Sequence, residues 1–240
     1  MSETARVATY VDAETQVLSA SNGVDYAYRL TGAAGRTPLV GLQHFRGNLD
    51  NWDPALIDAL ARGRQVITFD NRGVAATTGS TPNTIAQMAL DAIDFIDALG
   101  IGAVDLLGFS IGSFVAQEIA LIRPSIVGKL VLASSAPQGA GGMHGWAPDV
   151  IGAVGKPETS GEEYLSVFFT GSEASRTAGQ QLLGRIYGAR TVDRDADTSW
   201  QTRLAQYDAV CTWGQPNHSC CSGSRRSTSR CSWPTVTATR

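Results

Sequence analysis

The stretch AVDLLGFSIGSFVAQEIALI, residues 103–122, decides the fold. It opens on an apolar run, passes through Gly-Phe-Ser-Ile-Gly at 108–112, and continues into an apolar-faced segment that predicts a helix over 113–122. A serine between two glycines at a strand-to-helix junction sits on a sharp, strained turn, because the glycines let strand and helix approach without Cβ clashes. We therefore predict that Ser110 is a nucleophile whose hydroxyl points out over the sheet. The alternative is an ordinary glycine-rich turn.

Short apolar runs on both sides of this stretch predict the rest of a sheet. We expect strands at 24–30, 38–42, 66–69, 103–107 and 129–133, the first of them antiparallel. Helices are expected between them at 52–62 and at 84–99, with Thr84 as the N-cap of the second. Strands and helices in strict alternation predict an α/β fold with a doubly wound, mostly parallel sheet.

The chain divides into three expected parts. Residues 1–136 form the α/β core that carries the serine turn. Residues 137–210 are looser, with glycines and an aromatic patch, and we interpret them as a helical cap or lid region. Residues 211–240 hold all four cysteines and show no apolar periodicity, so they form an atypical tail.

Two backbone N–H groups are expected to stabilise an oxyanion beside the serine. One belongs to Ile111, at the N-terminal end of the following helix. The other is expected from the loop QHFRGN, residues 43–48, which follows an earlier strand, and Phe45 is the candidate donor. We interpret His44, in the same loop, as a hydrogen-bonded structural histidine rather than as a general base.

These motifs together resemble the α/β-hydrolase family, in particular its bacterial esterase, perhydrolase and cofactor-free haloperoxidase branches. The resemblance runs from about Val24 to about Leu204 and is carried by QHFRGNLDNWDP, FDNRG, GFSIG and KLVLASSAP. It implies hydrolysis of a small ester or related acyl compound through an acyl-enzyme, by a Ser, acid, His triad in that chain order and without a cofactor. Phe45, Trp146 and Phe168 would line the substrate pocket between core and cap.

The acid and the histidine that this resemblance implies are missing. In the family the acid follows a late strand in a Gly-x-x-Asp turn and the histidine follows the last strand, and neither motif is present. After the serine only His144 and His218 remain, and neither follows a recognisable strand. We interpret both as cap or surface residues.

The codons of residues 221–240 offer an explanation for this gap. Read one base earlier, from the last base of Cys220, they permit Leu-Gln-Arg-Leu-Ala and then an apolar run such as Val-Leu-Val-Ala-Asn-Gly-Asp-x-Asp. We therefore hypothesise that a frameshift near codon 220 replaced the last strands and the triad's acid and histidine, which would leave this chain inactive. A natural Ser/Arg/Thr-rich tail is the alternative.

Composition limits the expected partners. A formal net charge of −3 gives no basic surface for nucleic acid. The amino terminus has no secretory pattern and no apolar run reaches the roughly 18 residues that span a bilayer, so we expect a cytoplasmic protein without a membrane partner. The cysteines contain no C-x-x-C pair, and no metal site is expected. The oligomeric state stays open.

Two other functions compete with the serine hydrolase. One is a non-catalytic module that binds a small molecule in the pocket between core and cap. The other is an active enzyme that recruits His144 or His218 as its base.

Overall fold

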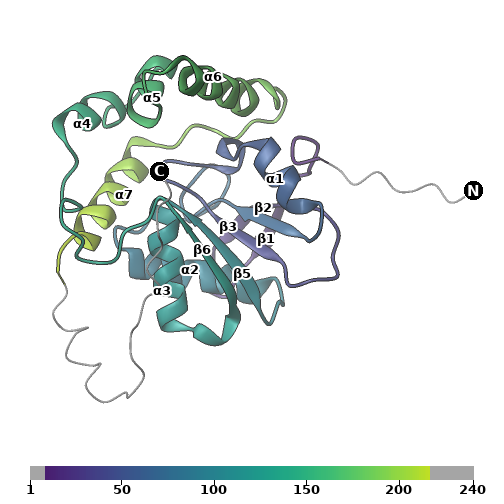
Figure 1. Ribbon diagram of the computed structural model, residues 1–240. Coiled ribbons are helices and arrows are strands. Elements are labelled where there is room, and N and C mark those ends of the chain that lie inside the picture. The colour runs from purple at the N-terminus through teal and green to yellow at the C-terminus, as the bar shows by residue number, and fades with distance from the viewer. Residues whose placement is uncertain (1–8, 217–240) are drawn as a thin grey trace, which may run out of the picture.

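The computed structural model of the protein describes residues 9–216 (Figure 1), and residues 1–8 and 217–240 lie outside this description. The strands are β1 (Gln16–Ser19), β2 (Asp25–Thr31), β3 (Leu39–Leu42), β4 (Val66–Phe69), β5 (Val104–Phe109) and β6 (Val127–Ala133). The α-helices are α1 (Pro54–Ala61), α2 (Ile85–Ala98), α3 (Ile111–Ile122), α4 (Pro148–Val154), α5 (Gly161–Phe168), α6 (Glu173–Gly188) and α7 (Trp200–Trp213). Two short 3-10 helices are η1 (Leu49–Asn51) and η2 (Pro124–Ile126).

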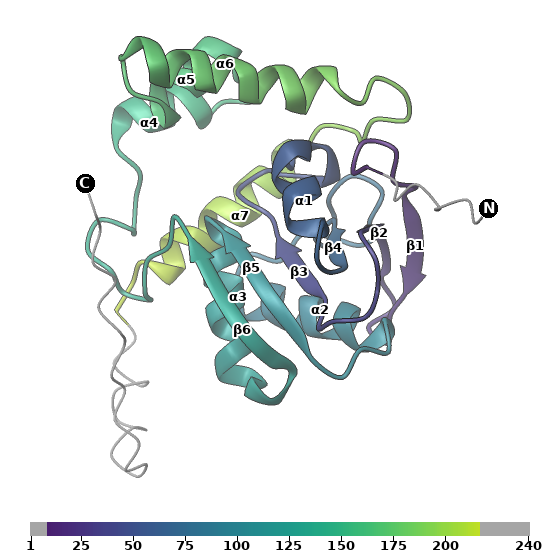
Figure 2. The ribbon, with the colours of Figure 1, turned by 45° about the vertical axis from the view of Figure 1, so that its right-hand side comes forward.

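The six strands form one sheet in the order β1-β2-β4-β3-β5-β6. Strands β3 to β6 run parallel, whereas β1 and β2 add an antiparallel edge. Helices α2, α3 and α7 contribute to the core on one face of the sheet, and α1 packs in a second cluster on the other (Figure 2). The predicted α/β class with a doubly wound, mostly parallel sheet is confirmed.

Local sequence explains the central elements. All four residues of β3 and of β4 are buried, because helices cover both faces of a parallel sheet. Thr84 caps α2 as predicted, since its hydroxyl accepts a hydrogen bond from the Gln87 N–H at 3.2 Å. The same helix ends before Gly100, whose φ of 70° suits a residue without a Cβ.

Helix α7 was not predicted, and it packs with the core rather than with the cap. The Trp213 ring stacks on Phe114 of α3 with ring centroids 5.5 Å apart. The inner face of α7 also buries polar residues such as Thr202 and Gln206, which hides its periodicity in the sequence. This helix spans the predicted boundary between residues 210 and 211 and continues to Trp213.

Helices α4, α5 and α6 lie within the range 137–210 that we interpret as a cap, and we refer to them as the cap. Figures 1 and 2 show these three helices in a layer beyond the carboxyl ends of β5 and β6. Arg185 of α6 joins the cap to the core, because its guanidinium donates two hydrogen bonds, of 2.8 and 2.7 Å, to the carboxylate of Asp53 at the N-cap of α1.

Strand β6 forms the edge of the sheet opposite β1. In the described part of the chain β6 pairs with β5 alone, and the Val131 side chain is 51% exposed. The hypothesis of lost final strands concerns residues 217–240, which lie outside the described residues. None of the helices between residues 9 and 216 has the length and apolar character needed to cross a membrane.

Candidate active site

Ser110 occupies the turn between β5 and α3 with φ 54° and ψ −121°. Positive φ is strained for a residue with a side chain, at a cost of about 1–3 kcal/mol, and such strain gathers at functional sites. The Ser110 N–H donates to the Ala133 carbonyl at the end of β6 at 2.9 Å, which fixes the turn against the neighbouring strand. The hydroxyl makes no capping hydrogen bond to the helix. The backbone here has the conformation that the Gly-x-Ser-x-Gly pattern predicts.

Both flanking glycines are required by close backbone contacts. A Cβ on Gly108 would lie 2.5 Å from the carbonyl oxygen of Gly112. One on Gly112 would lie 2.1 Å from the carbonyl oxygen of Leu42. The second contact presses the first turn of α3 against the end of β3, so the loop after β3 lies beside the serine turn.

The backbone N–H groups of Phe45 and Ile111 are the predicted oxyanion donors. Ile111 is the first residue of α3, where an N–H has no partner inside the helix. Within residues 9–216 neither N–H donates a backbone hydrogen bond. The His44 ring packs edge-on against Phe109, with centroids 5.4 Å apart, and so brings the loop to the residue before the serine. Both amides are therefore available near the carboxyl end of β5.

His44 is hydrogen-bonded, as predicted. Its Nδ1 lies 2.8 Å from the Phe45 carbonyl oxygen, and since a carbonyl only accepts, the bond assigns the proton to Nδ1. Burial lowers the pKa of His44, and this bond opposes the shift in part. This hydrogen bond holds the peptide group between Phe45 and Arg46 in place.

A buried carboxyl anchors the far end of this loop. Asp70, at the end of β4, accepts a hydrogen bond from the Leu49 N–H at 2.8 Å. Burial raises the pKa of Asp70 well above its ordinary value, and the nearby Asp195 carboxylate raises it further. Asn48 caps η1, since its side chain accepts from the Asp50 N–H at 3.0 Å. These bonds hold the far end of the loop.

The structure brings one of the two predicted pocket residues to this loop. Trp146 lies edge-on to Phe45 at a centroid distance of 4.7 Å and to Tyr207 of α7 at 5.0 Å. Phe168, by contrast, is 57% exposed and packs against Tyr164 within α5, with centroids 4.6 Å apart. No described contact joins Phe168 to Phe45 or Trp146.

A general base is not evident in the described part of the chain. His44 is engaged with the Phe45 carbonyl and His144 is exposed, whereas His218 lies outside residues 9–216. In the same range no three His, Cys, Asp or Glu side chains gather in a way that could hold a metal ion.

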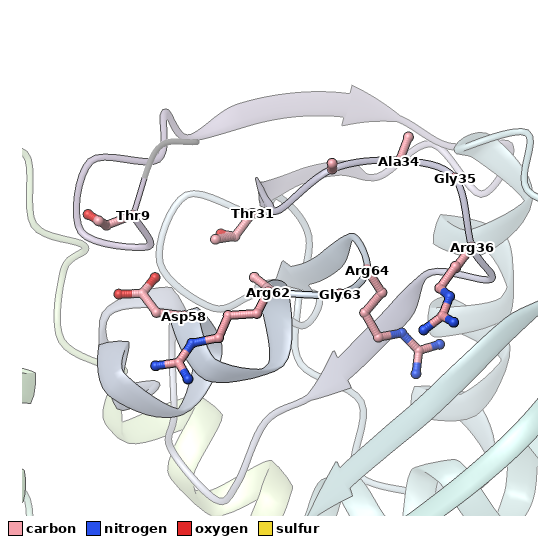
Figure 3. A pocket seen from close by; sticks show the side chains of 11 residues that line it. Thr9, Thr31, Ala34, Gly35, Arg36, Asp58, Arg62, Gly63 and Arg64 are labelled. Carbon is pink, nitrogen blue, oxygen red and sulfur yellow. The ribbon is translucent and has the colours of Figure 1, made fainter. Parts of the chain in front are cut away.

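A groove of about 660 Å³ lies at the opposite edge of the sheet, where β3 and β4 begin (Figure 3). Figure 3 shows the guanidinium groups of Arg36 and Arg64 at one end and Asp58 with Thr9 at the other. Arg64 is already bound to Asp105, at 2.5 Å. The groove lies far from the serine, because Ser110 follows the carboxyl end of β5.

The fold and the serine turn together define the class. Residues 37–198 match the family described as alpha/beta hydrolase fold, and the chain belongs to this family.

Several individual proteins are similar to this chain in sequence or in structure. The chain is similar to an alpha/beta hydrolase fold protein from Chitinophaga pinensis, with a TM-score of 0.82 and 44% identity over 88% of this chain and 75% of that one. It is 36% identical over 96 residues to a Mycobacterium tuberculosis protein named non-heme bromoperoxidase BpoC, covering 40% of this chain and 37% of the relative. It is 36% identical over 88 residues to a Rhizobium rhizogenes protein named carbamate hydrolase RutD, covering 36% and 33%. The chain thus matches little more than a third of the length of these two named relatives.

Proposed function

We propose that the protein is a serine hydrolase scaffold for small esters or related acyl compounds, with Ser110 as the nucleophile. The observation that carries the proposal is the strained backbone of Ser110 beside two amides without a backbone acceptor, those of Phe45 and Ile111. Donors preorganised in this way stabilise the negative charge that develops on an acyl oxygen.

The reaction begins when the Ser110 Oγ attacks the acyl carbon. A bond forms between Oγ and this carbon, the bond from the carbon to the leaving oxygen breaks, and the serine proton ends on the leaving alcohol. The N–H groups of Phe45 and Ile111 hold the tetrahedral oxyanion. Water then hydrolyses the acyl-enzyme to acid and free serine. Trp146, packed on Phe45, would form an apolar wall for the acyl group.

We further propose that this chain turns over slowly, because residues 9–216 place no uncommitted buried histidine beside Ser110. Loss of a triad member lowers kcat by about 10⁴- to 10⁶-fold, and the oxyanion donors account for much of what remains. The similarity to a protein named carbamate hydrolase supports an acyl or related substrate for this site.

The experiment is a stopped-flow assay with a chromogenic acetate ester, read together with the intact mass of the protein. We expect an added acetyl group on the wild-type chain and none on S110A. Acetylation of S110A at the wild-type rate would refute the assignment. The competing binding module is favoured if neither chain is acetylated and a non-hydrolysable ester analogue binds both equally.

A further inference from the structure

Arg46 follows the oxyanion donor Phe45 in the chain and is bonded to the cap. Its guanidinium donates hydrogen bonds to the carbonyl oxygens of Lys156 at 2.9 Å and Pro157 at 2.7 Å. Both carbonyls belong to the connection between α4 and α5. Because the planar guanidinium donates to two backbone carbonyls at once, it fixes the orientation of that connection as well as its distance from Arg46.

The backbone of Arg46 is held as tightly as its side chain. Its φ of 61° is left-handed, which a residue with a Cβ adopts only when its surroundings impose it. The Arg46 N–H donates to the Gln206 side chain at 2.6 Å, and its carbonyl accepts from the Thr198 hydroxyl at 2.5 Å. Gln206 belongs to α7, and Thr198 lies in the segment that leads from the cap back to the core.

The segment that returns from the cap to the core forms several hydrogen bonds with the loop that carries Phe45. The Asn48 side chain donates to the Ala196 carbonyl at 3.2 Å, and Asp50 accepts from the Asp195 N–H at 2.7 Å. Together with the bond from Thr198 to Arg46, these contacts fasten residues 195–198 to residues 46–50. The loop that carries the Phe45 N–H is therefore attached both to the α4–α5 connection and to the segment that leaves the cap after α6.

We propose that Arg46 is a positioning residue that couples docking of the cap to the orientation of the Phe45 N–H. The inference rests on the proposed function of Phe45. It goes beyond that function because it states that docking of the cap and correct placement of the Phe45 N–H in the oxyanion site occur together. When the cap docks, the two carbonyls of the α4–α5 connection bind the guanidinium and hold the left-handed turn. When the cap leaves, the turn loses these two bonds, and the Phe45 N–H is held less tightly by the remaining contacts of Gln206, Thr198 and His44.

The cap offers a matched control in Arg185. Its guanidinium also forms a two-bond contact between cap and core, to Asp53, and it does not touch the oxyanion loop. R185K therefore weakens a second contact between cap and core and leaves the neighbours of Arg46 in place. R46K keeps the charge and loses the fork, whereas R46G removes the side chain and suits the left-handed backbone.

The test combines hydrogen exchange with pre-steady-state acylation of Ser110 by the chromogenic ester. In R46K and R46G we expect faster exchange both at 44–48 and at 195–198, acylation slower by about tenfold to a hundredfold, and KM changed by less than about threefold. In R185K we expect faster exchange in α6 and acylation within about twofold of wild type. Equal slowing in R46K and R185K, or faster exchange in R46K confined to the α4–α5 connection, would overturn the proposal.

The exchange measurement separates this proposal from the proposed function. If the wild-type chain is not acetylated on Ser110, the function of the site is refuted while the exchange at 44–48 still decides the coupling. If acetylation is normal and exchange at 44–48 is the same in R46K and wild type, the coupling is refuted and the function stands.

Discussion

The carbonyl oxygen of Leu42 lies so close to Gly112 that a Cβ there would approach it to 2.1 Å. This contact joins the end of β3 to the first turn of α3 and so sets the distance between the loop at residues 43–48 and the serine turn. Because the obstacle is backbone rather than a flexible side chain, any larger residue must push the strand and the helix apart.

We expect G112A to lower the free energy of unfolding by about 2–4 kcal/mol, since overpacking a tight site costs about 1–3 kcal/mol and the displaced backbone adds to this. Urea unfolding followed by tryptophan fluorescence measures the change. G102A is the matched control, because nothing lies within 4 Å of a Cβ at Gly102, and it should stay within about 0.5 kcal/mol of wild type. Equal stability of G112A and wild type would contradict the close contact.

The strain at Ser110 predicts that the catalytic position is a cost to stability. A glycine accepts φ 54° freely, whereas alanine keeps the strain, so S110G should be more stable than S110A by about 1 kcal/mol. Both variants lose acetylation, because neither has a hydroxyl. Thermal unfolding of the two proteins side by side checks the order of stability, and a more stable S110A would argue against the strained turn.

Asp70 predicts a dependence of stability on pH. Burial holds the pKa of its carboxyl well above the ordinary 3.8, so the folded chain keeps this proton to higher pH than the unfolded chain does. The stabilising contribution is present at low pH and is lost as pH rises through the folded-state pKa, by about 1.4 kcal/mol for each unit of the shift. D70N still accepts from the Leu49 N–H, and it should lack this decline.

Denaturant unfolding of wild type and D70N at several pH values measures the difference between their slopes. Asp97 supplies a control of opposite sign, because hydrogen bonds from Arg123 lower the pKa of its carboxyl. D97N should remove a contribution that is present above pH 3.8 and lost at lower pH. Parallel slopes for wild type and D70N would show that Asp70 ionises normally.

Sequence predicted those parts of the molecule that are encoded locally. The serine turn, the cap of α2 by Thr84 and the buried strands β3 and β4 each depend on residues that are neighbours in the chain. Helix α7 was missed because its inner face buries polar groups such as Gln206. The hydrogen bond between Arg46 and Thr198 joins residues 152 positions apart, and no local sequence pattern predicts it.

The positions of the predicted pocket residues likewise depend on contacts that the local sequence does not encode. Trp146 and Phe168 were chosen for their aromatic character in a region of weak periodicity. Trp146 packs on Phe45, whereas Phe168 is exposed on α5. Which face of a cap helix turns toward the core depends on how the whole cap docks, and this is set by contacts such as that of Arg185 with Asp53.

The edge strand β6 gives the frameshift hypothesis a physical consequence. Within residues 9–216 no strand pairs with the outer side of β6, and Val131 is exposed, a combination that favours association. We propose that the apolar run permitted by the shifted codons of residues 221–240 would add a strand to this sheet and that its Gly-Asp turn would supply a carboxylate. Sequencing the DNA from codon 210 onward is the direct test. An intact open reading frame whose codons cannot encode Gly-Asp in the shifted frame would refute the hypothesis.

A chain rebuilt in the shifted frame after Cys220 tests the consequence for the protein. We expect it to unfold at a temperature higher by several degrees, since about 1 kcal/mol corresponds to about 2–4 °C for a domain of this size. It should also bind less of a dye that reports exposed apolar surface, because an added strand covers the edge of β6. A chain that stops at Cys220 is the control. If it matched the rebuilt chain in stability and dye binding, the shifted segment would contribute nothing to the sheet.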